Sequence, residues 1–327
     1  MTEFTFSTGA KSAAGVKVIL TSGSGINAGK FISEEEAAAL RAAVRKQKFD
    51  GKAGTFAEIF NGKTRIVAAG TGARPNALDL QILGGKLYKK ISGEETAAVF
   101  IPADKKNPLS AGETAAGIAL GIELGGYRFD KYFTKKPADS YPKLEKVEFL
   151  SETQIDDKEF ADNRALANAV RYARDLCNEP ANNLTPEIYA ADIKRLDYLG
   201  IDVTVLDEAK LHDLGMDMLL SVAQGSVNSP RVAVLQWKGK KDAKEFDLGL
   251  VGKGVTFDSG GISLKPAANM GDMKGDMTGS AVVVAAIKAA ALQRRRRGRP
   301  GGKHAFRFGN ASRRHRPFNV RANGGNR

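Results

Sequence analysis

The segment that decides the fold reads Val251-Gly-Lys-Gly-Val-Thr-Phe-Asp-Ser-Gly-Gly-Ile-Ser-Leu-Lys-Pro266 and resumes at Met273-Lys-Gly-Asp-Met-Thr-Gly-Ser280. An apolar segment typical of a strand precedes it, and a long apolar helix is expected to follow it. Its charged side chains stand among glycines, and those of interest are Lys253, Asp258, Lys265, Asp272 and Asp276. Carboxylate oxygens suit hard divalent cations, and turns at the ends of regular elements hold such ligands still. The segment therefore predicts a bound metal ion with a substrate carbonyl beside it.

Each of these residues also has an ordinary structural explanation. Asp258, in Phe-Asp-Ser-Gly-Gly, could form an Asx turn. Lys253 could be a surface lysine, and it could ligate a metal only as the neutral amine. Asp272 and Asp276 are four residues apart at the start of the expected helix, where their charges could complement the helix dipole.

Two motifs together resemble a known family. Gly252-Lys-Gly-Val-Thr-Phe-Asp-Ser-Gly-Gly-Ile-Ser-Leu-Lys-Pro266, followed by Met273-Lys-Gly-Asp-Met-Thr-Gly-Ser-Ala281, is similar in order, spacing and residue type to the metal-site segment of the leucyl aminopeptidases, peptidase family M17. Arg174-Asp-Leu-Cys-Asn-Glu-Pro-Ala-Asn-Asn-Leu-Thr-Pro186 resembles the start of that family's catalytic domain. The resemblance covers residues 1–292.

The resemblance implies a role for each matching residue. Lys253, Asp258 and Asp276 would be metal ligands, with Asp258 bridging two ions, and Asp272 would only cap a helix. Lys265 would be the catalytic lysine that polarises the scissile carbonyl and stabilises the oxyanion. Lys265 would also bind substrate through that carbonyl. Met273 would bind substrate by forming a wall of the pocket for the substrate's first side chain; the alternative for Met273 is helix packing.

The same resemblance implies a chemistry and an assembly. Two divalent ions (zinc or manganese, with magnesium or cobalt as alternatives) would activate a water that hydrolyses the N-terminal bond of a peptide, with a preference for leucine. In the family, an arginine-held bicarbonate shuttles the proton, and the catalytic domains assemble into a homo-hexamer.

The chain is predicted to be an α/β protein with two domains. Residues 1–150 alternate strand-like and helical patterns, which favours a largely parallel sheet. A polar, proline-bearing stretch at 135–142 is a plausible exit from this domain. Residues 232–237 and 248–251 are apolar on both faces, as in strands covered on both sides. The resemblance implies a macro-like N-terminal domain, and residues 151–292 would be the first part of a three-layer α/β/α metallopeptidase domain that is incomplete here.

Composition indicates a cytoplasmic protein. The apolar share is 42%, and the single cysteine, Cys177, excludes an internal disulfide and suits a reducing compartment. The first residues lack the pattern of a secretory signal, and charges or glycines interrupt every apolar run before it reaches membrane-spanning length. We therefore expect no membrane partner.

Residues 293–327 differ in composition from the rest of the chain. They hold eleven arginines and one lysine but no Asp or Glu, so +12 of the net charge of +13 lies there. No carboxylate follows Asp276, although the resemblance implies two further carboxylate ligands and the bicarbonate arginine beyond it. We interpret this stretch as a non-native, disordered tail translated out of frame, so that the chain alone would be inactive and the hexamer disfavoured. The alternative is a native basic tail that binds nucleic acid or an acidic partner.

Overall fold

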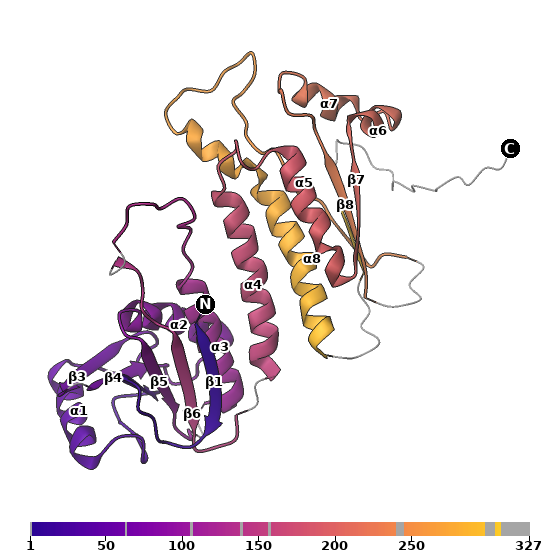
Figure 1. Cartoon of the computed structure of the whole chain (residues 1–327). Helices are drawn as coiled ribbons and strands as arrows, with labels where there is room; N and C mark the ends of the chain where they lie inside the picture. Colours follow the sequence, from indigo (N-terminus) through magenta and orange to yellow (C-terminus); the bar gives the residue numbers. More distant parts are fainter. Residues whose placement is uncertain are drawn as a thin grey trace. The chain divides into compact units, whose positions relative to one another are not determined.

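The computed structural model describes residues 2–62, 64–104, 107–137, 140–155, 158–239, 245–297 and 305–308. Contacts between residues divide the chain into two compact units, Met1–Tyr172 and Ala173–Arg327 (Figure 1). This division falls later than the boundary predicted at residue 150.

The first unit is built on a six-stranded sheet in the order β1-β6-β5-β2-β4-β3. Its strands are β1 (Glu3–Thr8), β2 (Val16–Thr21), β3 (Phe56–Asn61), β4 (Thr64–Gly70), β5 (Thr96–Ile101) and β6 (Lys146–Ser151). All neighbours are parallel except β3 and β4, which are antiparallel. The predicted α/β class with a largely parallel sheet is confirmed for this unit.

Helices cover both faces of this sheet. Because successive strand residues point to opposite faces, Val18 packs in one apolar cluster and Ile19 in another. The Val18 cluster includes residues of α2 (Ala77–Ile91) and α3 (Ala111–Gly125), and the Ile19 cluster includes residues of α1 (Glu34–Lys46). The result is a three-layer unit with a core on each side of the sheet.

Helices α2 and α3 cross at a very short distance because glycines face each other. A Cβ at Gly84 would lie 2.1 Å from the Ile118 carbonyl oxygen, and a Cβ at Gly121 would lie 2.0 Å from that of Gln81. Any side chain at either position would force the helices apart.

The predicted exit at 135–142 is not the end of the first unit. After it, the chain returns as β6 and pairs with both β1 and β5. Helix α4 (Lys158–Asn178) then donates two side-chain hydrogen bonds to carbonyls of α3, from Asn163 to Ala116 at 3.1 Å and from Arg171 to Glu123 at 3.0 Å. Pairing and packing keep this stretch in the first unit, although its local composition resembles a linker.

The second unit holds a mixed four-stranded sheet in the order β7-β8-β10-β9. Its elements after α4 are α5 (Pro186–Lys194), η2 (Arg195–Leu199), β7 (Ile201–Leu206), α6 (Glu208–Asp213), α7 (Asp217–Ala223), β8 (Val232–Lys238), β9 (Leu248–Leu250), η3 (Met270–Met277), α8 (Thr278–Arg297) and β10 (Ala305–Phe308). Strand β8 is antiparallel to β7 and β10, whereas β10 is parallel to β9. Figure 1 shows α5 and α8 running alongside each other next to β7 and β8.

One prediction for this unit is wrong. The strand expected at 248–251 is not covered on both faces, since Leu248 of β9 is 44% exposed and Val251, just after it, is 57% exposed; β9 lies at one edge of this sheet. Helical structure also extends past Leu292. Helix α8 continues to Arg297, because arginine is a good helix former, and residues 305–308 form β10. The other residues of the basic stretch lie outside the described part of the chain.

One helical stretch has the length and apolar composition that a membrane-spanning helix requires. Among the described residues, Met270–Gln293 is long and apolar enough by length and composition alone, contrary to the prediction that no run reaches that length. Ala281, Val284 and Ile287 of this stretch are buried. A core helix of a soluble protein meets the same requirement.

Candidate metal centre

The predicted site residues come from two loops that flank strand and helix ends. Lys253 lies three residues after β9, and Asp258 and Lys265 lie in the loop that follows. Asp276 stands near the end of η3, just before α8. The sequence predicted one α-helix across this junction, but the 3-10 turns of η3 precede α8, so Asp272 and Asp276 do not share an α-helical face.

Glycines let the Lys253 loop touch the first turn of α8. A Cβ at Gly252 would lie 2.5 Å from Ser280 Cα, and one at Gly279 would lie 3.1 Å from the Lys253 nitrogen. The backbone N–H of Ser280 donates a hydrogen bond of 2.8 Å to the Lys253 carbonyl oxygen. This contact brings Lys253 to Asp276, and neither glycine could be replaced without moving one of the two segments.

The lysines and carboxylates of the site form two ion pairs. Lys253 Nζ lies 2.8 Å from Asp276 Oδ1. Lys265 Nζ pairs with the Asp258 carboxylate and donates a hydrogen bond of 3.1 Å to the Asp258 carbonyl oxygen. The four side chains are therefore mutually neutralised.

The pKa of Asp258 is lowered by its surroundings. The hydrogen bond from Lys265 has the largest effect, followed by the backbone N–H of Gly260, which donates to Oδ1 at 2.9 Å. The positive charge of Lys253 lowers this pKa further. Gly260 has a φ of +100°, and a Cβ there would lie 2.3 Å from the Ser263 carbonyl oxygen, so the turn requires glycine.

One atom of the site has no partner. Asp276 Oδ2 is buried and accepts no hydrogen bond from any residue that the structure describes. A buried carboxylate oxygen without a donor is costly unless a cation binds it. No group of three His, Cys, Asp or Glu side chains suited to a metal ion occurs among the described residues. A lysine-assisted pair of carboxylates fits a divalent ion, because carboxylate oxygens are its preferred ligands.

Met273 and Asp272 differ in their surroundings. Met273 Sδ lies 3.5 Å from Lys265 Nζ, so the two residues assigned to substrate binding are neighbours. Asp272 is exposed and lies in the first turn of η3 rather than at the N-terminus of α8. The predicted capping of the long helix by Asp272 is therefore wrong.

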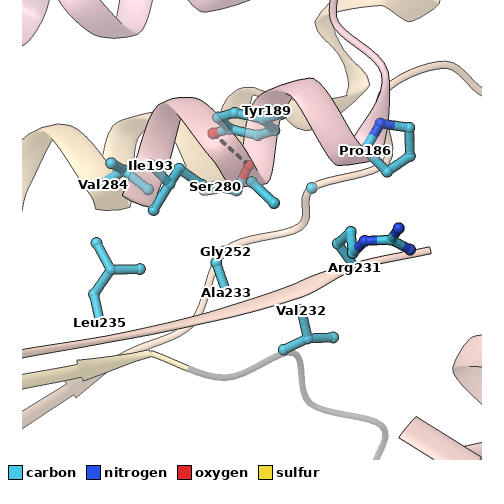
Figure 2. A pocket seen from close by; sticks show the side chains of 12 residues that line it. Pro186, Tyr189, Ile193, Arg231, Val232, Ala233, Leu235, Gly252, Ser280 and Val284 are labelled. Atoms are coloured by element: carbon cyan, nitrogen blue, oxygen red, sulfur yellow. Dashed lines mark hydrogen bonds between the residues drawn. The ribbon is translucent and has the colours of Figure 1, made fainter. Parts of the chain in front are cut away.

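A small cavity adjoins the Lys253 loop. It measures ≈ 70 Å³, and Gly252 and Gly254, on either side of Lys253, line it together with residues of α5, β8 and α8 (Figure 2). Tyr189 of α5 points across it to Ser280, with the two hydroxyl oxygens 3.0 Å apart. Sequence reasoning did not single out either residue, and nothing local in the sequence links them.

A second, larger cavity shares Pro186, Arg231 and Gly254 with the first. Its volume is ≈ 420 Å³, and its lining includes Met216, Met218 and Leu219 near α7 and the residues 254–257 that precede Asp258.

Comparison with known proteins identifies the family of this chain. The model of the Cytosol aminopeptidase family, N-terminal domain, matches residues 18–136, and that of its catalytic domain matches residues 171–297. This chain belongs to the cytosol aminopeptidase family. The match of the catalytic-domain model extends past Leu292 to the end of α8, so the predicted limit of the resemblance is too early.

Relatives of this cytosol aminopeptidase family member are longer than the chain. The probable cytosol aminopeptidase of Rhizobium etli (strain CIAT 652) is 39% identical over 301 residues, which cover 89% of this chain and 60% of the relative. That of Rhizobium rhizogenes is 45% identical over 236 residues, or 70% of this chain and 47% of the relative. The chain thus spans about 60% of the length of the curated relatives that it matches most extensively.

Solved structures show the same fold. A bottromycin maturation enzyme, BotP, in complex with Mn is 30% identical with a TM-score of 0.70, covering 90% of this chain and 58% of that one. A mutant of tomato leucine aminopeptidase is 23% identical with a TM-score of 0.73, covering 94% of this chain and 62% of that one. The two-domain architecture with a partial C-terminal domain is confirmed.

Proposed function

We propose that this protein is built on the plan of a metal-dependent aminopeptidase, an enzyme that removes N-terminal residues from peptides, and that this chain alone holds only part of the catalytic site. The observation that carries the proposal is the buried, partnerless Asp276 Oδ2 beside the Lys253–Asp276 ion pair, in a segment that matches the catalytic-domain family model. A bound divalent ion would supply an activated water and would polarise the peptide carbonyl.

The residues of the site divide this work. Asp258 and Asp276 would hold the metal through carboxylate oxygens, and Lys253 would join them after losing its proton. Lys265 would keep its proton and stabilise the negative charge that develops on the carbonyl oxygen. Its ion pair with Asp258 holds it at the site meanwhile. Met273, next to Lys265, would contact the side chain of the substrate's first residue.

Finer parts of the proposal follow the resemblance. We propose two metal ions, with manganese as the first candidate because the related bottromycin maturation enzyme is described in complex with Mn. The alternative metal ions are zinc, magnesium and cobalt. As in the family, a bicarbonate would shuttle the proton, and the preferred N-terminal residue would be leucine. We place the protein in the cytoplasm, since its relatives carry the name cytosol aminopeptidase. The family's homo-hexamer is not proposed for this chain.

Metal binding tests the proposal directly. Calorimetric titration of the purified chain with Mn²⁺ is expected to show binding that Asp276→Asn weakens at least about tenfold, because an amide carries no charge for the ion. Asp272→Asn is the matched control and should leave the affinity unchanged, since Asp272 is exposed and the site lysines pair instead with Asp276 and Asp258. Equal affinity in both variants and the unaltered protein would contradict the proposal.

Hydrolysis of leucine p-nitroanilide tests the chemistry. With manganese or zinc added, we expect this chain to show no more hydrolysis than its Lys265→Ala variant, because the resemblance implies two carboxylate ligands that this sequence does not contain after Asp276. A metal-dependent rate that Lys265→Ala abolishes would show that Lys253, Asp258 and Asp276 suffice, and would overturn the view that the chain alone is inactive.

The basic stretch favours a second candidate function. Eleven arginines and one lysine without a carboxylate between residues 293 and 327 suit contact with nucleic-acid phosphates. Anisotropy of labelled duplex DNA should then show binding that falls steeply between about 50 and about 200 mM salt and disappears when residues 293–327 are removed. Absence of such binding excludes this candidate. Reading the gene in its other frames tests the out-of-frame interpretation, which predicts that another frame encodes the implied ligand segment.

A further inference from the structure

The start of α8 is hydrogen-bonded to two other helices of the second unit. The Tyr189 hydroxyl of α5 lies 3.0 Å from Ser280 Oγ, and Cys177 Sγ of α4 lies 3.2 Å from Thr278 Oγ1. Figure 2 shows Tyr189 directed at Ser280 across the cavity beside Gly252. The side chains of Ser280 and Thr278 also donate hydrogen bonds to carbonyls of η3, so the start of α8 is bonded to three other helical segments.

The proton count fixes the direction of the Tyr189–Ser280 hydrogen bond. Ser280 Oγ donates its one proton to the Met277 carbonyl oxygen at 2.8 Å. The Tyr189 hydroxyl therefore donates to Ser280 Oγ. Tyr189 is only 5% exposed, and burial raises the pKa of its hydroxyl, so it keeps the proton that it donates.

Ser280 contacts both halves of the metal site. Its backbone N–H donates to the Lys253 carbonyl oxygen at 2.8 Å, and its side chain binds the carbonyl of Met277, the residue next to Asp276. A shift of Ser280 would therefore move Lys253 relative to Asp276, whose side chains are now 2.8 Å apart. Tyr189, 91 residues away in the sequence, fixes Ser280 from a separate helix.

We propose that Tyr189 and Ser280 are positioning residues of the metal centre, which hold the Lys253 loop against the first turn of α8 so that Lys253 and Asp276 face one ion. This inference rests on the proposed function for the presence of the ion, but the placement of Lys253 exists without it. Their proposed role is to position the Lys253 loop, not to ligate the ion.

Two substitutions test the inference with little change in shape. Tyr189→Phe removes only the buried hydroxyl, and Ser280→Ala removes the acceptor while keeping the backbone N–H. Ser221→Ala is the matched control, because Ser221 Oγ makes the same type of bond to the carbonyl three residues earlier, Met218, at 2.9 Å in α7. Thermal unfolding of each variant confirms that it is folded.

Two measurements on the full chain separate the inference from the proposed function. Without metal, hydrogen exchange of the amide at position 280 reports the contact with Lys253, and Tyr189→Phe and Ser280→Ala are expected to accelerate it about tenfold. With metal, calorimetry should show Mn²⁺ affinity reduced about tenfold in both variants, as for other residues that orient metal ligands. Ser221→Ala should alter neither quantity.

Each outcome decides a separate point. Unchanged exchange at position 280 in Tyr189→Phe overturns the inference, as does an unchanged Mn²⁺ affinity in a protein that binds Mn²⁺. Accelerated exchange in a protein that binds no Mn²⁺ supports the positioning of Lys253 and overturns the proposed metal function instead.

Discussion

At the scale of single residues, the two lysines of the site neutralise its two aspartates in the structure. Lys253 donates to Asp276, and Lys265 pairs with Asp258. A metal ion that binds Asp276 and Lys253 must therefore replace a proton on Lys253, because only the neutral amine can ligate. Asp258 needs no such exchange, since its lowered pKa keeps it ionised.

This exchange predicts proton release on metal binding. The Mn²⁺ affinity should rise with pH, because binding releases a proton and a lower proton concentration favours that release. Titrations in two buffers of different ionisation enthalpy measure the protons released. In Lys253→Met the release should vanish, and an equal release in that variant would place the exchanging proton elsewhere.

A second residue-scale prediction concerns Glu123 of α3. It is 4% exposed, its Oε1 accepts no hydrogen bond from the described residues, and burial raises its pKa above 4.5 despite the opposing charge of Arg171. The folded state therefore binds this proton more tightly than the unfolded state does. Stability contributed by the protonated carboxyl is complete below about pH 4.5 and is lost as the pH rises through the raised pKa.

Replacing Glu123 removes this dependence. Glu123→Gln should be more stable than the unaltered protein by about 1 kcal/mol at pH 8 but not at about pH 4. Urea unfolding at both pH values measures the difference. Glu113→Gln, at the exposed N-terminus of the same helix, is the comparison and should show no gain at high pH. An equal gain at both pH values would contradict the explanation.

At the scale of elements, the crossing of α2 and α3 depends on glycine. Gly121→Ala should destabilise the first unit by about 1–3 kcal/mol, because the new Cβ would lie 2.0 Å from the Gln81 carbonyl oxygen. Thermal or urea unfolding measures the loss.

The same crossing provides a control. A Cβ at Gly85 would meet its nearest atom, the Gly121 carbonyl oxygen, at 3.6 Å, which is an ordinary contact. Gly85→Ala should therefore be neutral or stabilising, since alanine has the higher helix propensity. Similar losses in both variants would mean that the crossing is not the cause.

At the scale of the whole molecule, the chain holds two units with separate cores. Unit Met1–Tyr172 is centred on the six-stranded sheet, and unit Ala173–Arg327 on the mixed sheet with α5 and α8. A unit with its own core unfolds in one cooperative transition, so two such units should give two transitions in calorimetry.

Substitutions in each core should assign the transitions. Gly121→Ala is expected to lower the midpoint of one transition only. Leu235→Ala leaves a cavity at a buried position of β8 and should destabilise the second unit by about 2–5 kcal/mol, so it should lower the midpoint of the other transition only. A single transition that both variants shift equally would contradict the independence of the units.

Much of this organisation can be predicted from the sequence because its signals are local. Ser33 and Glu36 form a capping box at the start of α1, and Thr185 caps α5 with Pro186 in its first turn. Helix ends of this kind depend on residues three or four positions apart. The motif from Gly252 to Ala281 likewise identifies the family from local information, through residue types at fixed spacings.

The sequence by itself therefore determined the α/β class, the starts of α1 and α5, and the family. Only the tertiary structure decided that β6 enters the first sheet between β1 and β5, that residues 305–308 lie between β8 and β9, and that Lys253 faces Asp276. It also decided the contact between Tyr189 and Ser280. The physical reason is that packing and strand pairing select these partners over long sequence separations, whereas capping and turn formation are settled by neighbours along the chain.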